Sequence, residues 1–476
     1  MKTVSVHASR SYEIRIGSGL LQGAGEQIRA VTDAKKVMLV SDDAVWPLYG
    51  DAVRRSLETA GLTVCSFVFP HGESSKCACT YLELLDALCA QQLTRKDAIA
   101  ALGGGVAGDL AGFAASTYLR GIGFIQIPTT LLAMVDSSVG GKTAIDLPAG
   151  KNLAGTFYQP WLVLCDPDCL TTLPEEIFPP VCESPDITGT VTEDAAAATG
   201  LAAGTPVCGG GGDAVLSLLS AGIARDDRLG VTLGTSGVVA APIQSYRPNP
   251  EGKLQMFCST TPGTWTAIGC TLAAAGSYHW FCQTLGTHEL LRQQQEGVDA
   301  YILLDEQAQT VPAGCGGLLY FPYLMGERCP LFDADARGAF WGIDSTMGKG
   351  HFARAVLEGV AYSLRQVYDL TRNPEDSAPE CIVVCGGGSK SGLWRQILAD
   401  VFQLPVCTTG GAAEGSAYGA ALLAGVAGGF WHDTEEAAAQ CRLLTRLEPC
   451  PERRGAYEKQ YARYCALYRS MTNKER

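Results

Sequence analysis

The stretch GGGVAGDLAGFAASTYLRGIGFIQIPTTLLAMVDSSVGGKTAIDLPAGKNLAGTFYQP, residues 103–160, decides the fold of the first part of the chain. It follows the apolar run DAIAAL at 97–102, and its first glycines have the spacing G-x-G-x-x-G. Glycines at a strand-to-helix turn let backbone N–H groups approach a pyrophosphate, which the N-terminus of the helix also favours. Such glycines also allow a helix to pack closely on a sheet, so the motif by itself leaves both interpretations open.

Strand-like and helix-like segments alternate before this turn. KKVMLVSD (35–42) and LTVCSFVFP (62–70) are apolar runs of strand length. The segment from Asp51 to Gly61 and TYLELLDALCAQQ (80–92) have helical spacing. This alternation predicts β-α-β units around a mostly parallel sheet, and therefore an α/β fold.

The glycine-rich stretch, with HGESSK at 71–76 and TLPEE at 172–176, resembles the NAD-binding domain of 3-dehydroquinate synthase. The resemblance implies a Rossmann-like domain over residues 1–178, with NAD as cofactor and a phosphorylated carboxylate as substrate. In that family NAD transiently oxidises a substrate hydroxyl, phosphate leaves, and the hydride returns. By resemblance the NAD-binding residues are Glu73, Lys76, Gly104, Gly105, Gly108, Asp109, Thr129, Thr130, Lys142 and Lys151. The substrate-binding residues are Arg120, Asp136 and Asn152, and Lys142 and Lys151 also match positions that hold the substrate.

The chain departs from that family where the family's divalent metal should be held. The metal needs one glutamate and two histidines from a second, helical domain. Here IFPPVCESPDITG follows TLPEE, and prolines at 179, 180 and 185 forbid the helix that should carry the glutamate. None of the six histidines lies in the family's histidine motif. We therefore expect the synthase's metal to be lost and no metal site to remain.

A second set of glycine-rich turns begins near residue 179. The segments PVCGGGGDAVLSLLSAGI, RLGVTLGTSGVVAA and CIVVCGGGSKSGLWRQILADVF each combine a strand-like run, glycines or hydroxyls, and in two cases a helix. Any one of them would cradle a phosphate or a nucleoside. Together with LLYFPYLMGERCPLFDADARGAFWG at 318–342 and GAFWGIDSTMGKGHFARAVLEG at 338–359, they resemble the second domain of FGGY carbohydrate kinases, xylulokinase branch. The resemblance implies an actin-like, ribonuclease-H-like domain over residues 179–476.

This second resemblance implies a sugar and ATP with Mg²⁺ as ligands. Asp213 is then the catalytic base that takes the sugar hydroxyl's proton, although an aspartate there would also cap the helix that follows. Glu327 and Arg328 in MGER are expected to form a structural ion pair. By resemblance the ATP-binding residues are Gly234, Thr235, Ser236, Gly276, Gly387, Gly388 and Ser391.

Half of each parent enzyme is missing, since the first kinase domain with its phosphate loop has no counterpart in residues 1–178. Three functions stay open. They are residual sugar kinase activity, 3-dehydroquinate synthase activity, and a non-catalytic nucleotide-binding chain that other polypeptides complete. The kinase ranks first by descent, because its part is longer and keeps the proton acceptor. Loss of a whole domain from each parent favours the third for the isolated chain.

The joint between the two patterns carries no Gly/Ser-rich linker. We infer a recombination or sequence-assembly joint through similar short stretches, or a fusion whose halves dock on each other or on partner chains. The net charge of −13 argues against nucleic-acid and anionic-membrane partners. No signal-peptide core and no long apolar stretch is evident, so we expect a cytoplasmic protein. Interfaces left uncovered by the missing domains predict association between copies.

Overall fold

The computed structural model of the chain describes residues 1–174, 180–249, 251–373 and 378–472. It divides into two compact units, Met1–Pro180 (unit 1) and Val181–Arg476 (unit 2). The predicted joint at 178/179 lies outside the described residues. In the described part of the chain, no helix is long and apolar enough to cross a membrane.

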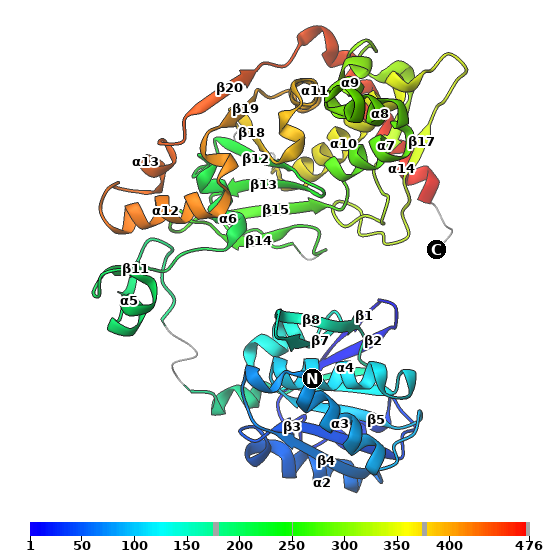
Figure 1. The fold of residues 1–476 in the computed structure, drawn as a ribbon, viewed down its shortest axis with the longest axis vertical. Coiled ribbons are helices and arrows are strands. Elements are labelled where there is room, and N and C mark those ends of the chain that lie inside the picture. The colour runs from blue at the N-terminus through cyan, green and yellow to red at the C-terminus, as the bar shows by residue number, and fades with distance from the viewer. Residues whose placement is uncertain (175–179, 250, 374–377, 473–476) are drawn as a thin grey trace. The chain divides into compact units, whose positions relative to one another are not determined.

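Unit 1 is built on a seven-stranded sheet in the order β1-β2-β9-β6-β5-β3-β4, in which only the β1–β2 pair is antiparallel (Figure 1). The predicted mostly parallel sheet is therefore confirmed, and the two expected strands before the glycine turn appear as β3 and β4. The strands are β1 (Lys2–Val6), β2 (Tyr12–Ile16), β3 (Lys36–Asp42), β4 (Thr63–Phe69), β5 (Ala98–Gly103), β6 (Gly123–Pro128) and β9 (Leu162–Cys165), with a separate hairpin of β7 (Lys142–Leu147) and β8 (Gly150–Phe157).

Helices cover both faces of this sheet, and two apolar clusters fill the space between the layers. Strands β5 and β6 are buried along their whole length, which explains their continuous apolar sequence. The expected helices before and after the glycine turn are confirmed. The helices are α1 (Ala24–Arg29), α2 (Asp51–Thr59), α3 (Ala78–Ala90) and α4 (Gly105–Thr117), with short turns η1 (Trp46–Gly50), η2 (Glu73–Ser75), η3 (Tyr118–Arg120), η4 (Ala133–Ser137) and η5 (Pro167–Thr172).

Unit 2 contains a mixed seven-stranded sheet in the order β14-β15-β13-β12-β18-β19-β20. Strands β12, β18 and β19 are parallel to one another, whereas β13, β15 and β14 form an antiparallel meander on one side. This sheet fits the expected ribonuclease-H-like fold. Its strands are β12 (Arg228–Leu233), β13 (Gly237–Ile243), β14 (Gln255–Cys258), β15 (Trp265–Thr271), β18 (Cys381–Cys385), β19 (Val406–Thr409) and β20 (Leu443–Leu447).

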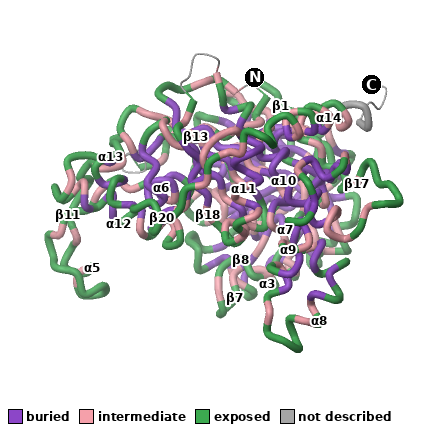
Figure 2. The backbone as a smooth tube through the Cα atoms, turned by 90° about the horizontal axis from the view of Figure 1, so that it is seen from above, coloured by how far each residue is buried: buried purple, intermediate pink, exposed green. Residues whose placement is uncertain are grey.

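Two small ribbons accompany this sheet. The pair β10 (Ile187–Thr190) and β11 (Pro206–Cys208), with helix α5 (Glu193–Thr199) between them, is largely exposed (Figure 2). The other ribbon is β16 (Leu319–Phe321) with β17 (Ala339–Trp341). The remaining helices are α6 (Asp213–Ser220), α7 (Ala275–Leu285), α8 (Thr287–Glu296), α9 (Ala300–Gln309), α10 (Lys349–Thr371), α11 (Gly392–Phe402), α12 (Gly415–Ala427), α13 (Thr434–Ala438) and α14 (Arg454–Thr472), with turns η7 (Cys315–Gly317), η8 (Gly387–Lys390), η9 (Gly411–Ala413) and η10 (Pro451–Arg453).

Helix α10 runs through the centre of unit 2 and is buried along most of its length. A helix that is buried on all sides must hold its charged residues in pairs. Arg354 and Glu358 are one turn apart on α10, with side chains 4% and 2% exposed, and their N–O distance is 2.7 Å. Tyr457 of α14 bonds to both of them. This pair joins two helices inside the core.

Candidate functional site

Lys76 links three separate segments of unit 1 at the carboxyl ends of the parallel strands. Its ammonium donates to Asp109 Oδ2 and to Asn152 Oδ1, both at 2.5 Å. Lys76 is 4% exposed, so this contact is shielded from water. Burial raises the pKa of Asp109, and the Lys76 ammonium opposes that rise. The structure thus brings together three residues that the sequence places in different motifs.

The glycine turn after β5 lies against the turn after β6. Thr129 donates its N–H to Gly103 O at 3.0 Å. A Cβ on Gly104 would lie 3.2 Å from Thr130 Cγ2, and one on Gly105 would lie 3.2 Å from Ser137 Oγ. The Thr129 hydroxyl is buried and has no hydrogen-bond partner within the described ranges of the chain. Close turns, the start of α4 and an unpaired hydroxyl fit a ligand with phosphate and hydroxyl groups, as NAD has.

The other site residues predicted in unit 1 do not all lie near Lys76. Glu73 and Lys151 form an ion pair of 3.2 Å near Lys76. Asp136 on η4 and Lys142 at the start of β7 are exposed. Arg120 follows the end of α4 and precedes β6, so it lies at the amino ends of the strands. Within this chain, the structure therefore does not bring Arg120 together with the other predicted residues.

The residues of the chain do not fit the metal that the synthase resemblance implies. Among the described residues, no three His, Cys, Asp or Glu side chains are grouped closely enough to hold a metal ion. Glu183 lies in a loop, where its carboxylate accepts the N–H of Gly263 at 3.2 Å. The one acidic residue near the position of the family's glutamate is thus engaged with backbone, and it has no histidine partners for a metal in the described part of the chain.

In unit 2, two predicted turns and the start of α7, where Gly276 lies, meet at the carboxyl ends of strands β12 and β18. These strands are parallel neighbours, so the turns 234–236 and 386–391 leave the sheet at the same edge. A Cβ on Gly386 would lie 2.7 Å from Leu233 O, and one on Gly276 would lie 2.8 Å from Thr235 O. Thr235 and Ser236 are exposed, which leaves their hydroxyls open to a ligand. The arrangement offers hydroxyl and backbone N–H groups to phosphates.

Two further predicted residues lie at helix starts. Ser391 caps α11 by accepting the N–H of Trp394 at 3.0 Å. Asp213 is the first residue of α6 rather than its cap, because Gly212 holds that position and the Asp213 carboxylate accepts the adjacent N–H of Ala214. Its carboxylate is exposed, and no hydrogen bond in the described part of the chain joins it to the turns 234–236 and 386–391 or to Gly276. The predicted base is therefore accessible to solvent.

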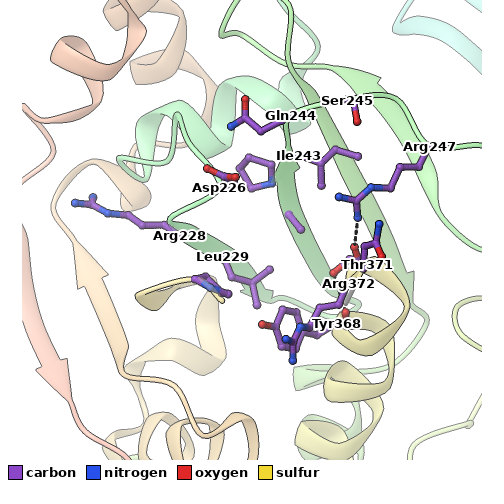
Figure 3. A pocket seen from close by; sticks show the side chains of 14 residues that line it. Asp226, Arg228, Leu229, Ile243, Gln244, Ser245, Arg247, Tyr368, Thr371 and Arg372 are labelled. Carbon is purple, nitrogen blue, oxygen red and sulfur yellow. Dashed lines mark hydrogen bonds between the residues drawn. The ribbon is translucent and has the colours of Figure 1, made fainter. Parts of the chain in front are cut away.

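A cavity of about 290 Å³ lies at the opposite end of β12, beside the C-terminal end of α10 (Figure 3). Its lining includes three arginines whose side chains have partners inside the protein. Arg228 donates to Gly222 O, Arg247 donates to Thr371 O, and Arg372 stacks over the ring of Tyr368. Because it is remote from the turns at the other end of the strand, this cavity is not part of the candidate site.

Three family models match the chain. Residues 66–179 match the N-terminal domain of 3-dehydroquinate synthase, and residues 229–428 match the C-terminal domain of the FGGY family of carbohydrate kinases. Residues 168–220 match the N-terminal domain of the FGGY family. The two expected resemblances are confirmed with one correction: the kinase part includes a segment of the first domain, and Asp213 lies within it.

Individual relatives agree with this division. Over 176 residues, 37% of this chain, unit 1 is 52% identical to a 3-dehydroquinate synthase of Latilactobacillus sakei and 53% identical to one of Caulobacter vibrioides. The chain spans about half the length of these relatives, 50% and 48%. Among solved structures, a xylulose kinase of Rhodospirillum rubrum matches 62% of this chain and 56% of its own, with 31% identity and a TM-score of 0.52. A xylulose kinase of Lactobacillus acidophilus, 24% identical with a TM-score of 0.56 over 62% and 58% of the two chains, shares the fold.

Proposed function

We propose that unit 2 is the nucleotide-binding and proton-accepting part of a sugar kinase that phosphorylates a pentulose such as xylulose. The observation that carries this proposal is the meeting of the turns 234–236 and 386–391 with the start of α7 at one edge of the sheet. Thr235 and Ser236 would hold the β- and γ-phosphates of ATP, and Gly387, Gly388 and Ser391 would border the adenosine. The nucleotide would supply the phosphoryl group, with Mg²⁺ on its phosphates.

Asp213 has the chemistry of the proton acceptor in this proposal. Transfer of a phosphoryl group to a hydroxyl requires a carboxylate that takes the hydroxyl proton. An exposed aspartate at the start of α6 is accessible to a sugar that a second domain delivers. Because such kinases work by closing two domains over their substrates, turnover requires a first kinase domain from another polypeptide.

We further propose that unit 1 binds NAD without the lyase reaction of its relatives. Lys76, held between Asp109 and Asn152, carries this proposal, because a buried ammonium at the carboxyl ends of the strands would attract a pyrophosphate. The groups Lys142, Lys151, Asp136 and Asn152 would serve a phosphorylated carboxylate. Arg120 lies at the amino ends of the strands, so it would not contact a substrate bound by these four residues. NAD would supply a hydride acceptor when bound.

Replacement of Lys76 by methionine should weaken NAD⁺ binding at least about tenfold, since it removes one charge-assisted contact and leaves Asp109 buried without its cation. Calorimetric titration of the full chain with NAD⁺ and, separately, with Mg-ATP tests both proposals, and micromolar binding is expected for each. Lys36→Met is the matched control, because Lys36 bonds to Gln91 O at the amino end of β3. Absence of NAD⁺ binding, or equal binding by the Lys76 variant, would contradict the NAD site.

The full chain should associate in solution through surfaces that the missing domains leave uncovered. In unit 1, four large apolar side chains are each more than half exposed: Leu132 directly before η4 (67%), Val135 on η4 (68%), and Leu153 and Phe157 on β8 (59% and 79%). Large apolar side chains grouped on a surface promote association. Light scattering should show oligomers whose size falls when Leu153 and Phe157 are both changed to lysine. A monodisperse monomer of the unaltered chain would refute the expectation.

A further inference from the structure

The turn 234–236 of unit 2, called the phosphate turn below, is hydrogen-bonded to residues 274–276, where α7 begins. Ala274 and Gly276 donate their N–H groups to Thr235 O at 2.9 and 3.1 Å. Ala275 donates to Gly234 O at 2.8 Å. These three backbone bonds mean that the position of residues 234–236 depends on where residues 272–276 lie.

Glu327 is hydrogen-bonded to Leu272, the first residue of the segment 272–276. Its Oε1 accepts the N–H of Leu272 at 2.9 Å and the N–H of Arg328 at 2.7 Å. In the described part of the chain the expected ion pair between Glu327 and the Arg328 guanidinium is not formed, and the Glu327 carboxylate accepts the backbone N–H of Arg328. Glu327 is 2% exposed, and its Oε2 has no hydrogen-bond partner among the described residues. The carboxylate is thus aimed at the backbone of the segment that carries the phosphate turn.

We propose that Glu327 is a positioning residue of the nucleotide site, which acts through the N–H of Leu272 on residues 272–276 and through them on the turn 234–236. This inference rests on the proposed function only for what the turn binds. The anchoring itself is a property of the fold, and it is measured without a ligand.

The charge on Glu327 should make this anchor depend on pH. Burial raises the pKa of Glu327 to about 7, and the two backbone N–H groups only partly oppose the rise. The groups facing it are Arg328, Cys329 and Asp333 on its own loop, Tyr323 before it, and Tyr464 and Tyr468 on α14. Burial also raises the pKa of each of the three tyrosines, so they stay neutral near pH 7.

The pKa of Glu327 is higher when its carboxyl group is buried against residues 272–276 than when this segment is detached. The carboxyl group therefore takes up a proton as the segment docks, so docking is favoured at low pH. The anchor should weaken as pH rises from about 5 to about 7 and stay weak above that. Glu327→Gln keeps an acceptor oxygen and has no charge, so it should hold the segment at every pH.

Hydrogen exchange of the full chain, expressed as protection factors, tests the proposal. Glu327→Ala should lower the protection of the N–H groups of residues 272–276 about tenfold at about pH 5, since it removes the acceptor of the Leu272 N–H and frees the segment whose N–H groups are donated to the turn 234–236. The unaltered chain should lose about tenfold protection in the same residues between about pH 5 and pH 8, and Glu327→Gln should not. The Gln variant should also melt a few degrees higher than the unaltered chain at about pH 8 and equally at about pH 5.

Glu289→Gln is the matched control. Glu289 is also 2% exposed, but its partners are Lys349 and Gln307, away from the phosphate turn. That variant should change stability without changing the protection of residues 274–276, whose N–H groups are donated to the turn 234–236. Unchanged protection of residues 274–276 in Glu327→Ala would overturn the proposal. A parallel Mg-ATP titration separates the two questions, because failure to bind would count against the proposed kinase site while hydrogen exchange still decides the role of Glu327.

Discussion

Glu358→Ala is expected to lower the free energy of unfolding of unit 2 by about 3 to 5 kcal/mol, because it leaves the Arg354 guanidinium buried without a counter-charge. Glu358 Oε1 accepts from Arg354 Nε at 2.7 Å, from Gly314 N at 3.1 Å and from Tyr457 Oη at 3.1 Å. The variant breaks all three contacts. Urea denaturation followed by circular dichroism measures the loss, and the transition of unit 1 should not move.

The chain offers a close control for this prediction. Arg292 and Glu296 also form an Arg–Glu pair one turn apart on a helix, at 2.7 Å, but their side chains are 39% and 47% exposed. Arg292→Ala should change stability by no more than about 0.5 kcal/mol, because water screens the exposed pair. Equal effects of the two substitutions would show that burial does not determine how much the Arg354–Glu358 pair contributes to the free energy of unfolding.

Local patterns were enough to predict much of unit 1. Its apolar runs had strand length, and its glycines sat where strands turn into helices, so β3, β4, β5 and α4 appear where the sequence predicts them. The turns of unit 2 were likewise located by glycines and hydroxyls. These features depend on neighbours in the chain, which a single sequence displays.

Contacts between distant segments were beyond the sequence. The Lys76 contact spans 33 positions to Asp109 and 76 to Asn152, and no local pattern links them. Arg120 follows the glycine turn closely in sequence, yet a helix carries it to the other edge of the sheet. MGER suggested an ion pair between neighbours, whereas burial and a backbone partner 55 positions away determine the role of Glu327. Three-dimensional packing decided each of these.

The two family matches overlap at the joint between the two parts of the chain. The synthase match ends at residue 179 and the first-domain kinase match begins at residue 168, so residues 168–179 fit both families. A stretch that satisfies both patterns is the kind of place where two genes can be joined without a linker. The overlap supports the inferred joint through similar short stretches, and it places the start of the kinase part before Val181.

Asp213→Asn should lower phosphoryl transfer about 10² to 10⁴-fold once the kinase site is completed, because the amide takes up no proton from the sugar hydroxyl. The assay combines the full chain with the separately produced first domain of the xylulose kinase of Rhodospirillum rubrum, and follows ADP release with D-xylulose. Mg-ATP binding by the variant should be unchanged, since in the described part of the chain Asp213 accepts a hydrogen bond from the N–H of Ala214 and none from the turns 234–236 and 386–391.

Asp226→Asn provides the comparison, because Asp226 is another exposed aspartate that lies before β12, at the end of that strand away from the turns. Its rate should equal that of the unaltered chain. If the Asp213 variant also keeps its rate, the proton acceptor has been assigned to the wrong residue. If the unaltered mixture binds Mg-ATP but releases no ADP with sugar present, unit 2 is a nucleotide-binding module, and the chain as a whole joins two such modules without kinase turnover.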